Sequence, residues 1–301
     1  MADLTPMMQQ YMATKEQYKD CILFYRLGDF YEMFFDDALV ASKELEITLT
    51  GKNCGQEERA PMCGIPYHAA DSYLTKLVNK GYKVAICEQV EDPKLAKGIV
   101  KREVIRIVTP GTNLNMMSLE ESRNNYLMCI AYTEDKIGIA VVDALTGDFY
   151  VTEVSDTKKL NDEIVKFSPS EIICNDNFLV SGYSIDDLRE RLGISINKID
   201  AWHFEEDSCQ KLLCKHFKVN TLTALGVDDF MAGQIAAGAV LAYLYETQKN
   251  SLSNITHLNP YIASKYMLLD SATRRNLELT ETLREKQKVR RIYGVLERQF
   301  S

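Results

Sequence analysis

The order of apolar and polar positions over residues 1–112 predicts strands and helices in alternation. Compact apolar runs are typical of buried strands, whereas apolar positions three or four residues apart indicate one face of a helix. The predicted strands are 21–25, 82–87 and 104–108, and the predicted helices are 8–18, 30–44 and 72–79. This alternation predicts an α/β domain with a mixed sheet.

Residues 30–44 are predicted as a helix because apolar side chains recur at helical spacing within them. Asp29 stands where an N-cap is expected, and Glu32, three residues later, completes the pattern of a capping box. On this prediction Phe30 opens the helix directly after a Gly28-Asp29 turn. Side chains at such a position are often exposed.

The pattern changes after a predicted linker at 113–123. Strands are predicted at 126–132, 137–143, 149–154 and 171–174, and helices at 160–167 and 228–248. Strands followed by helices indicate a sheet with helices packed on it, so residues 124–250 are predicted to form a second α/β domain. The small residues of 228–248 predict close packing of that helix. Residues 251–301 read as the start of a helical region.

Composition places the chain among ordinary globular proteins. It has 301 residues, 46% of them apolar and 26% charged, which suits two domains, or two and a fragment. The longest apolar run, 231–245, is too short to cross a bilayer, and the N-terminus has no signal-peptide pattern. We therefore expect a cytoplasmic protein without a membrane partner, whose eight scattered cysteines are reduced core thiols.

The net charge of −8 is unevenly distributed. Residues 1–111 have 14 basic and 16 acidic side chains, residues 112–250 have 12 and 22, and residues 251–301 have 9 and 5. This balance excludes a protein that binds nucleic acid through bulk positive charge alone. Any DNA contact must use local patches, and the acidic middle block suits a protein partner better.

Motifs for enzyme chemistry are absent or weak. The chain has no Gly-x-x-x-x-Gly-Lys-Ser/Thr loop, no His-Glu-x-x-His and no Cys-x-x-Cys. A weak zinc pattern consists of His203, Cys209, Cys214 and His216. A weak magnesium nuclease pattern consists of Asp143, Asp148 and Glu171. Neither has the spacing of a strong motif, so we expect no enzyme, no metal and no cofactor in this chain.

Two patterns point to nucleic acid. An exposed Phe30 has the chemistry of a wedge that unstacks bases, although core packing is the alternative for such a ring. A carboxylate at Glu32 is costly beside phosphates unless it bonds a base, and capping a helix is its alternative role. A basic stretch, interrupted by Glu103, is either a phosphate-contacting strip or a solvated face. Its members include Lys97, Lys101, Arg102 and Arg106.

Several motifs, in order along the chain, resemble the MutS family of DNA mismatch-repair proteins. They are TPMMQQY at 5–11, LFYRLGDFYE at 23–32, GIPYHA at 64–69, AICEQ at 85–89, VIRIVTPGT at 104–112 and ATRRNLE at 272–278. Collinear motifs of this length are highly specific. The resemblance covers roughly residues 1–288.

The resemblance implies both domains and roles. It implies a mismatch-binding domain at 1–112, a linker at 113–123, an RNase H-like connector domain at 124–250 and the start of a helical lever region at 251–301. The family's Phe-x-Glu motif falls on Phe30 and Glu32, which implies that Phe30 stacks on a mispaired base and Glu32 hydrogen-bonds it. The partners implied are mismatched duplex DNA and, through the connector, MutL. The location implied is cytoplasmic, with the nucleoid.

The resemblance also implies what belongs only to the full-length family. ATP, Mg²⁺ and dimerisation belong to regions outside the matched motifs, so we expect a monomeric, weakly DNA-binding chain. The motif pattern fails after Lys288, and residues 289–301 are hypothesised to be an out-of-frame extension. Residues after about 275 are expected to be frayed if helical. The alternative function is a protein-interaction module that acts through the acidic connector domain without binding DNA.

Overall fold

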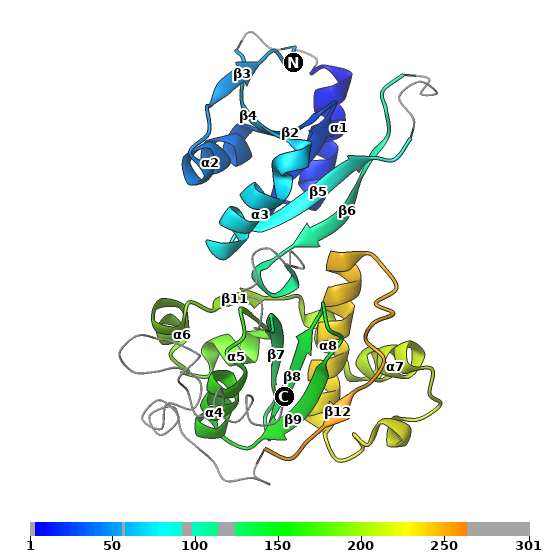
Figure 1. Cartoon of the computed structure of the whole chain (residues 1–301). Helices are drawn as coiled ribbons and strands as arrows, with labels where there is room; N and C mark the ends of the chain where they lie inside the picture. Colours follow the sequence, from blue (N-terminus) through cyan, green and yellow to red (C-terminus); the bar gives the residue numbers. More distant parts are fainter. Residues whose placement is uncertain (1–3, 56–57, 92–97, 114–123, 264–301) are drawn as a thin grey trace, which may run out of the picture.

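The computed structural model describes residues 4–55, 58–91, 98–113 and 124–263. They form two α/β units, one above the other in Figure 1, each built on a six-stranded sheet. The predicted fold class, two successive α/β domains, is confirmed. The predicted helical region 251–301 has no helix in its described part, 251–263. The rest of that region, with the tail 289–301, lies outside the described residues.

The first domain has a mixed sheet with the strand order β3-β4-β2-β1-β5-β6. Strand β1 pairs in parallel with β5, and every other pair in this sheet is antiparallel. Its elements are α1 (Pro6–Gln17), β1 (Cys21–Leu27), β2 (Phe30–Phe34), α2 (Phe35–Leu45), β3 (Thr50–Lys52), β4 (Ala60–Pro66), η1 (Tyr67–Ala69), α3 (Ala70–Asn79), β5 (Lys83–Gln89), β6 (Arg102–Val108) and η2 (Pro110–Thr112).

Helices cover both faces of this sheet, so alternate residues of its central strands enter two different cores. On one face Met8 and Tyr11 of α1 pack on Leu23 and Phe34. On the other face α2 and α3 contribute to a core that includes Tyr31. This period-two division of a strand is the reason that neighbours on β2 have opposite environments.

The predicted helix over 30–44 is wrong at its start, because residues 30–34 form strand β2 and the helix begins at Phe35. Phe30 pairs with Leu27 across a two-residue hairpin turn. Tyr31 and Met33 are buried while Phe30 is exposed, which is the alternation of a strand. The sheet therefore overrode the capping-box pattern, and Glu32 caps no helix.

The second domain has the strand order β11-β10-β7-β8-β9-β12. Strands β7, β8 and β9 form an antiparallel meander, and β10 adds in parallel to β7. Its elements are β7 (Tyr126–Tyr132), β8 (Ile137–Asp143), β9 (Phe149–Val154), α4 (Thr157–Phe167), β10 (Glu171–Cys174), α5 (Asp176–Val180), α6 (Ile185–Leu192), β11 (Ser195–Lys198), η3 (Ala201–Phe204), α7 (Glu206–Phe217), η4 (Leu222–Leu225), α8 (Met231–Gln248) and β12 (Asn259–Pro260).

Helix α8 packs closely on this sheet, as its small residues predict. A Cβ on Gly138 of β8 would lie 1.8 Å from the carbonyl oxygen of Ala232. A Cβ on Gly238 of α8 would lie 2.3 Å from the Cβ of Cys209 on α7. Glycine is therefore required at both contacts, because any side chain would separate the backbones.

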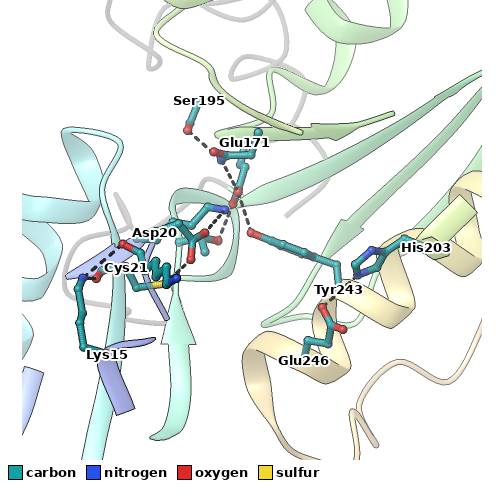
Figure 2. A network of polar contacts seen from close by, with 12 residues as sticks. Lys15, Asp20, Cys21, Glu171, Ser195, His203, Tyr243 and Glu246 are labelled. Carbon is teal, nitrogen blue, oxygen red and sulfur yellow. Dashed lines mark hydrogen bonds and ion pairs between the residues drawn. The ribbon is translucent and has the colours of Figure 1, made fainter. Parts of the chain in front are cut away.

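One buried carboxylate accepts hydrogen bonds from both domains. Glu171, on β10, is fully buried. Its Oε2 accepts hydrogen bonds from Thr109 Oγ1 and, at 3.0 Å, from the Gly111 amide at the end of the first domain. Its Oε1 accepts from Asn197 Nδ2 at 2.8 Å and from the Tyr243 hydroxyl at 3.0 Å. Figure 2 shows Tyr243 reaching Glu171 from α8.

Candidate nucleic-acid interface

Phe30 stands at the tip of the β1–β2 hairpin. Gly28 takes the first position of the turn with a φ of +57°, a conformation that glycine adopts without strain. The Phe30 side chain is 47% exposed, whereas Tyr31 beside it is buried. A large apolar ring is thus held outside the core by the pairing of its own strand.

Arg26 braces the hairpin from the side. Its Nε donates to the Gly28 carbonyl oxygen at 2.5 Å, and its guanidinium lies 3.8 Å from the centroid of the Tyr67 ring. It also forms an ion pair of 3.4 Å with Glu88. The Tyr67 amide donates to the Asp29 carbonyl oxygen at 2.9 Å. The turn that presents Phe30 is therefore tied to β4, η1 and β5.

Glu32 lies two residues further along β2, on the same face of the sheet as Phe30. Its Oε2 accepts a short hydrogen bond from Lys52 Nζ, on β3. The Glu32 side chain is 16% exposed and that of Lys52 is 32% exposed. On the neighbouring strand β4, Gly64 pairs with Glu32 and Pro66 pairs with Phe30. Phe30 and Glu32 therefore flank a glycine on one face.

The four residues of the predicted basic strip have different surroundings. Lys97 lies outside the described residues. Lys101 is exposed and paired with Glu103 at 2.6 Å. Arg102 turns inward, where its Nε donates to the Arg26 carbonyl oxygen at 2.7 Å. Its Nη1 donates to Gln10 Oε1 at 3.0 Å.

Arg106 also lies partly inside the domain. Burial lowers the pKa of its guanidinium, and its Nε has no hydrogen-bond partner among the residues that the structure describes. Of the three described members, only Lys101 has an exposed side chain, and it is paired with Glu103. The structure therefore does not bring the three together as one exposed strip, because Arg102 and Arg106 are engaged by, or packed into, their own domain.

Three of the four residues of the weak zinc pattern have hydrogen-bond partners within the protein. His203 Nε2 lies 3.0 Å from Glu246 Oε2, and the thiol of Cys209 donates to the His203 carbonyl oxygen at 3.1 Å. His216 contacts the Tyr245 hydroxyl at 2.7 Å. Within the described ranges, no group of three His, Cys, Asp or Glu side chains has the arrangement of a metal site.

The acids of the weak nuclease pattern support the backbone and the domain junction. Asp143 Oδ1 accepts from the Leu145 amide at 2.8 Å in the β8–β9 turn. Asp148 lies in the same turn and accepts from the Thr146 hydroxyl at 3.0 Å. Glu171 has both oxygens occupied by donors. These contacts account for all three carboxylates without a metal ion.

Sequence reasoning missed the residues that surround Phe30 and Glu32. Lys52 is separated from Glu32 by 20 positions, and no spacing rule joins β2 to β3 across α2. Gly64 and Tyr67 belong to a segment identified only as a turn and a family motif. The signal that was available is the Gly28-Asp29 pair between two runs rich in aromatic and apolar residues, a pattern that indicates a two-residue hairpin with a strand on each side.

The chain is thus a protein of two successive α/β domains, and the first domain has a strand with an exposed Phe-x-Glu motif. Residues 5–116 match the family model of MutS domain I, and residues 125–256 match that of MutS domain II. The chain therefore belongs to the MutS family, of which it contains domains I and II.

Curated relatives called DNA mismatch repair protein MutS align with nearly the whole chain. The protein of Lachnoclostridium phytofermentans is 66% identical over 298 residues, and that of Acetivibrio thermocellus is 55% identical over 301 residues. Both alignments cover 99% of this chain but only 32% and 34% of those relatives. The chain thus spans about a third of the length of the curated relatives it matches.

Both alignments cover 99% of this chain, so most of residues 289–301 fall within the aligned region. The hypothesis that these residues are an out-of-frame extension stays a prediction. Separately, no helix among the described residues has the length and apolar character needed to cross a membrane.

Proposed function

We propose that this chain recognises mismatched or unpaired bases in duplex DNA, with Phe30 as an intercalating wedge and Glu32 as a base contact. The observation that carries the proposal is an exposed aromatic ring on a braced two-residue hairpin, with a carboxylate on the same face. The relatives are named as DNA mismatch repair proteins, which agrees with this proposal.

The selectivity follows from the mechanical properties of DNA. Inserting an apolar ring between base steps requires unstacking and bending of the duplex. A mismatched step is unstacked at lower cost than a paired one, so deformation energy selects the lesion without reading a sequence. The tight hairpin keeps the Phe30 ring in one position during insertion. Stacking of the ring on one base contributes about 1–3 kcal/mol.

Phosphate contacts are a separate part of the proposal. They are assigned to Lys97, Lys101, Arg102 and Arg106. Lys101 is favoured among the described three, because the guanidinium of Arg102 already has protein acceptors and Arg106 is partly buried. Such contacts orient the protein on the duplex but do not distinguish a mismatch.

The properties of the whole protein are proposed only for longer members of the family. Dimerisation, ATP and Mg²⁺ are assigned to regions beyond domains I and II, so this chain is proposed to act without a cofactor and without hydrolysing a nucleotide. The second domain is proposed to contact MutL, which agrees with the acidic excess of residues 112–250.

Phe30→Ala tests the wedge. We expect the substitution to abolish the preference of the 301-residue chain for a duplex with one unpaired base over the matched duplex, measured by fluorescence anisotropy of labelled DNA. Leu39→Ala is the matched control, because the Leu39 side chain on α2 is also 47% exposed. The thermal unfolding midpoint should be nearly the same for both variants, since each loses an exposed side chain.

An unchanged preference in Phe30→Ala would disprove the wedge. A wild-type chain that binds neither duplex, but is retained on immobilised MutL, would instead favour the alternative of an interaction module acting through the second domain.

A further inference from the structure

Gly64, which pairs with Glu32 on β4, leaves a position beside both Phe30 and Glu32 without a side chain. A Cβ built on Gly64 would lie 3.6 Å from Glu32 Cγ and 4.0 Å from Phe30 Cδ1. It would thus touch both side chains at ordinary van der Waals distance. In the native protein that position, which we call the Gly64 gap, has no side chain.

Lys52 holds Glu32 at the edge of the Gly64 gap. Its ammonium group contacts Oε2 of Glu32 and lies 5.6 Å from the centroid of the Phe34 ring. Both side chains are largely shielded from solvent, at 32% exposure for Lys52 and 16% for Glu32. A cation in this position offsets the negative charge that Glu32 would bring to DNA phosphates, while Oε1 has no donor among the described residues.

We infer that Gly64 and Lys52 determine mismatch specificity together with Phe30 and Glu32. Gly64 lets a displaced base approach the backbone of β4 between the ring and the carboxylate, which is a use of glycine at close ligand contacts. Lys52 is a positioning residue that keeps the Glu32 carboxylate oriented and its charge offset. The inference rests on the proposed function of Phe30 and Glu32.

Gly64→Ala tests the Gly64 gap without straining the fold. The nearest atom to the new methyl group would be the Tyr31 carbonyl oxygen at 3.4 Å, which is an ordinary contact. We expect the ratio of affinities for unpaired-base and matched duplexes to fall about tenfold, the loss of one base-stacking contact. Unfolding midpoints should stay at the wild-type value or rise.

Gly51→Ala is the control for adding a methyl group to this sheet. Its Cβ would meet the side chain of Arg59, 3.1 Å from Arg59 Cβ, rather than Phe30 or Glu32. The affinity ratio should therefore be unchanged. A second readout is the fluorescence of 2-aminopurine placed beside the unpaired base, which reports unstacking and should rise with wild type and Gly51→Ala but not with Gly64→Ala.

Lys52 is tested by a double-mutant cycle with Glu32→Gln. We expect Lys52→Met to lower the affinity ratio about fivefold in the wild-type background and to have little effect when Glu32 is already Gln. Lys52→Arg should restore most of the ratio, because it keeps the positive charge. Lys80→Met, which removes a lysine paired with Glu44 at 2.7 Å, controls for the loss of one charge.

The outcomes separate the inference from the proposed function. An unchanged ratio in Gly64→Ala beside a lost ratio in Phe30→Ala would overturn the gap and leave the wedge intact. Equal losses from Lys52→Met in both Glu32 backgrounds would show a plain contact with phosphate and overturn the positioning role. If Phe30→Ala keeps the ratio, the proposed function fails and the inference fails with it.

Discussion

Two glutamates, one in each domain, show how different surroundings give the same side chain different roles. Glu171 is fully buried, and four donors from β11, α8 and the end of the first domain occupy its oxygens. Glu32, on β2, is 16% exposed and has one described side-chain donor, Lys52. A carboxylate with four protein donors is committed to the fold, whereas one with a single donor retains an oxygen for a ligand.

The difference teaches why burial alone does not identify a functional acid. A buried charge that is fully hydrogen-bonded rigidifies the structure around it, and a partly satisfied one remains available. Glu171 matches the first case, and it fixes η2 of the first domain to the second domain (Figure 2). Glu32 matches the second case, beside an exposed ring.

The largest effect is expected from Glu171→Ala. The change removes the acceptor that four donors share, and the Gly111 amide and the Tyr243 hydroxyl are buried, so the free energy of unfolding should fall by about 3–5 kcal/mol. Urea denaturation followed by circular dichroism measures this. Glu32→Ala, which removes one partly exposed ion pair, should cost no more than about 1 kcal/mol. An equal fall in the free energy of unfolding for the two variants would contradict the different roles of Glu171 and Glu32.

Alkaline pH should lower the stability of the protein through its buried tyrosines. Burial, with the charge of Glu171 next, raises the pKa of Tyr243 well above its usual value of 10.0. Burial also raises the pKa of Tyr25 to about 12. Because the folded-state pKa exceeds the unfolded one, this stability is complete below pH 10 and is lost as the pH rises towards the folded values.

Urea midpoints between pH 9 and 12 measure this loss. Tyr243→Phe is the control, because it cannot ionise at that position and should show a shallower decline above pH 10. A decline as steep as that of the wild type would show that Tyr243 contributes nothing to the alkaline limit.

Glu32→Gln should change recognition with little effect on stability. Gln keeps the size of the side chain but carries no charge, so repulsion from phosphates falls and matched duplex should bind more tightly. The preference for an unpaired base should therefore fall several-fold. Anisotropy titrations on both duplexes measure the ratio, and an unchanged ratio with wild-type stability would remove Glu32 from the site.

The smallest effect is expected from Lys101→Gln. Lys101 and Glu103 are both more than half exposed, so removing their ion pair should leave the urea midpoint unchanged. If Lys101 contacts a phosphate, the salt dependence of DNA binding should lose about one unit of slope. Arg102→Gln is the contrasting variant, because its bonds to Arg26 and Gln10 predict a loss of stability as well.

The sequence by itself determined most of the elements and the family. The strands 126–132, 137–143, 149–154 and 171–174 occur where the apolar pattern predicts them, because apolar residues predominate in each and most of them are buried. The collinear motifs indicated the MutS family, and the small residues of α8 predicted its close packing. These features depend on residues that lie close together along the chain, and such spacings can be read directly from a sequence.

Only the tertiary structure decided what surrounds Phe30 and Glu32. A capping-box pattern favoured a helix over 30–34, but pairing with β1 on one side and β4 on the other made that segment a strand. The same pairing placed Gly64 opposite Glu32 and brought Lys52 to it from β3. It also turned Arg102 inward, towards Arg26 and Gln10. The physical reason is that sheet pairing joins residues of large separation along the chain, and its energy exceeds the local preference of a few residues for a helix.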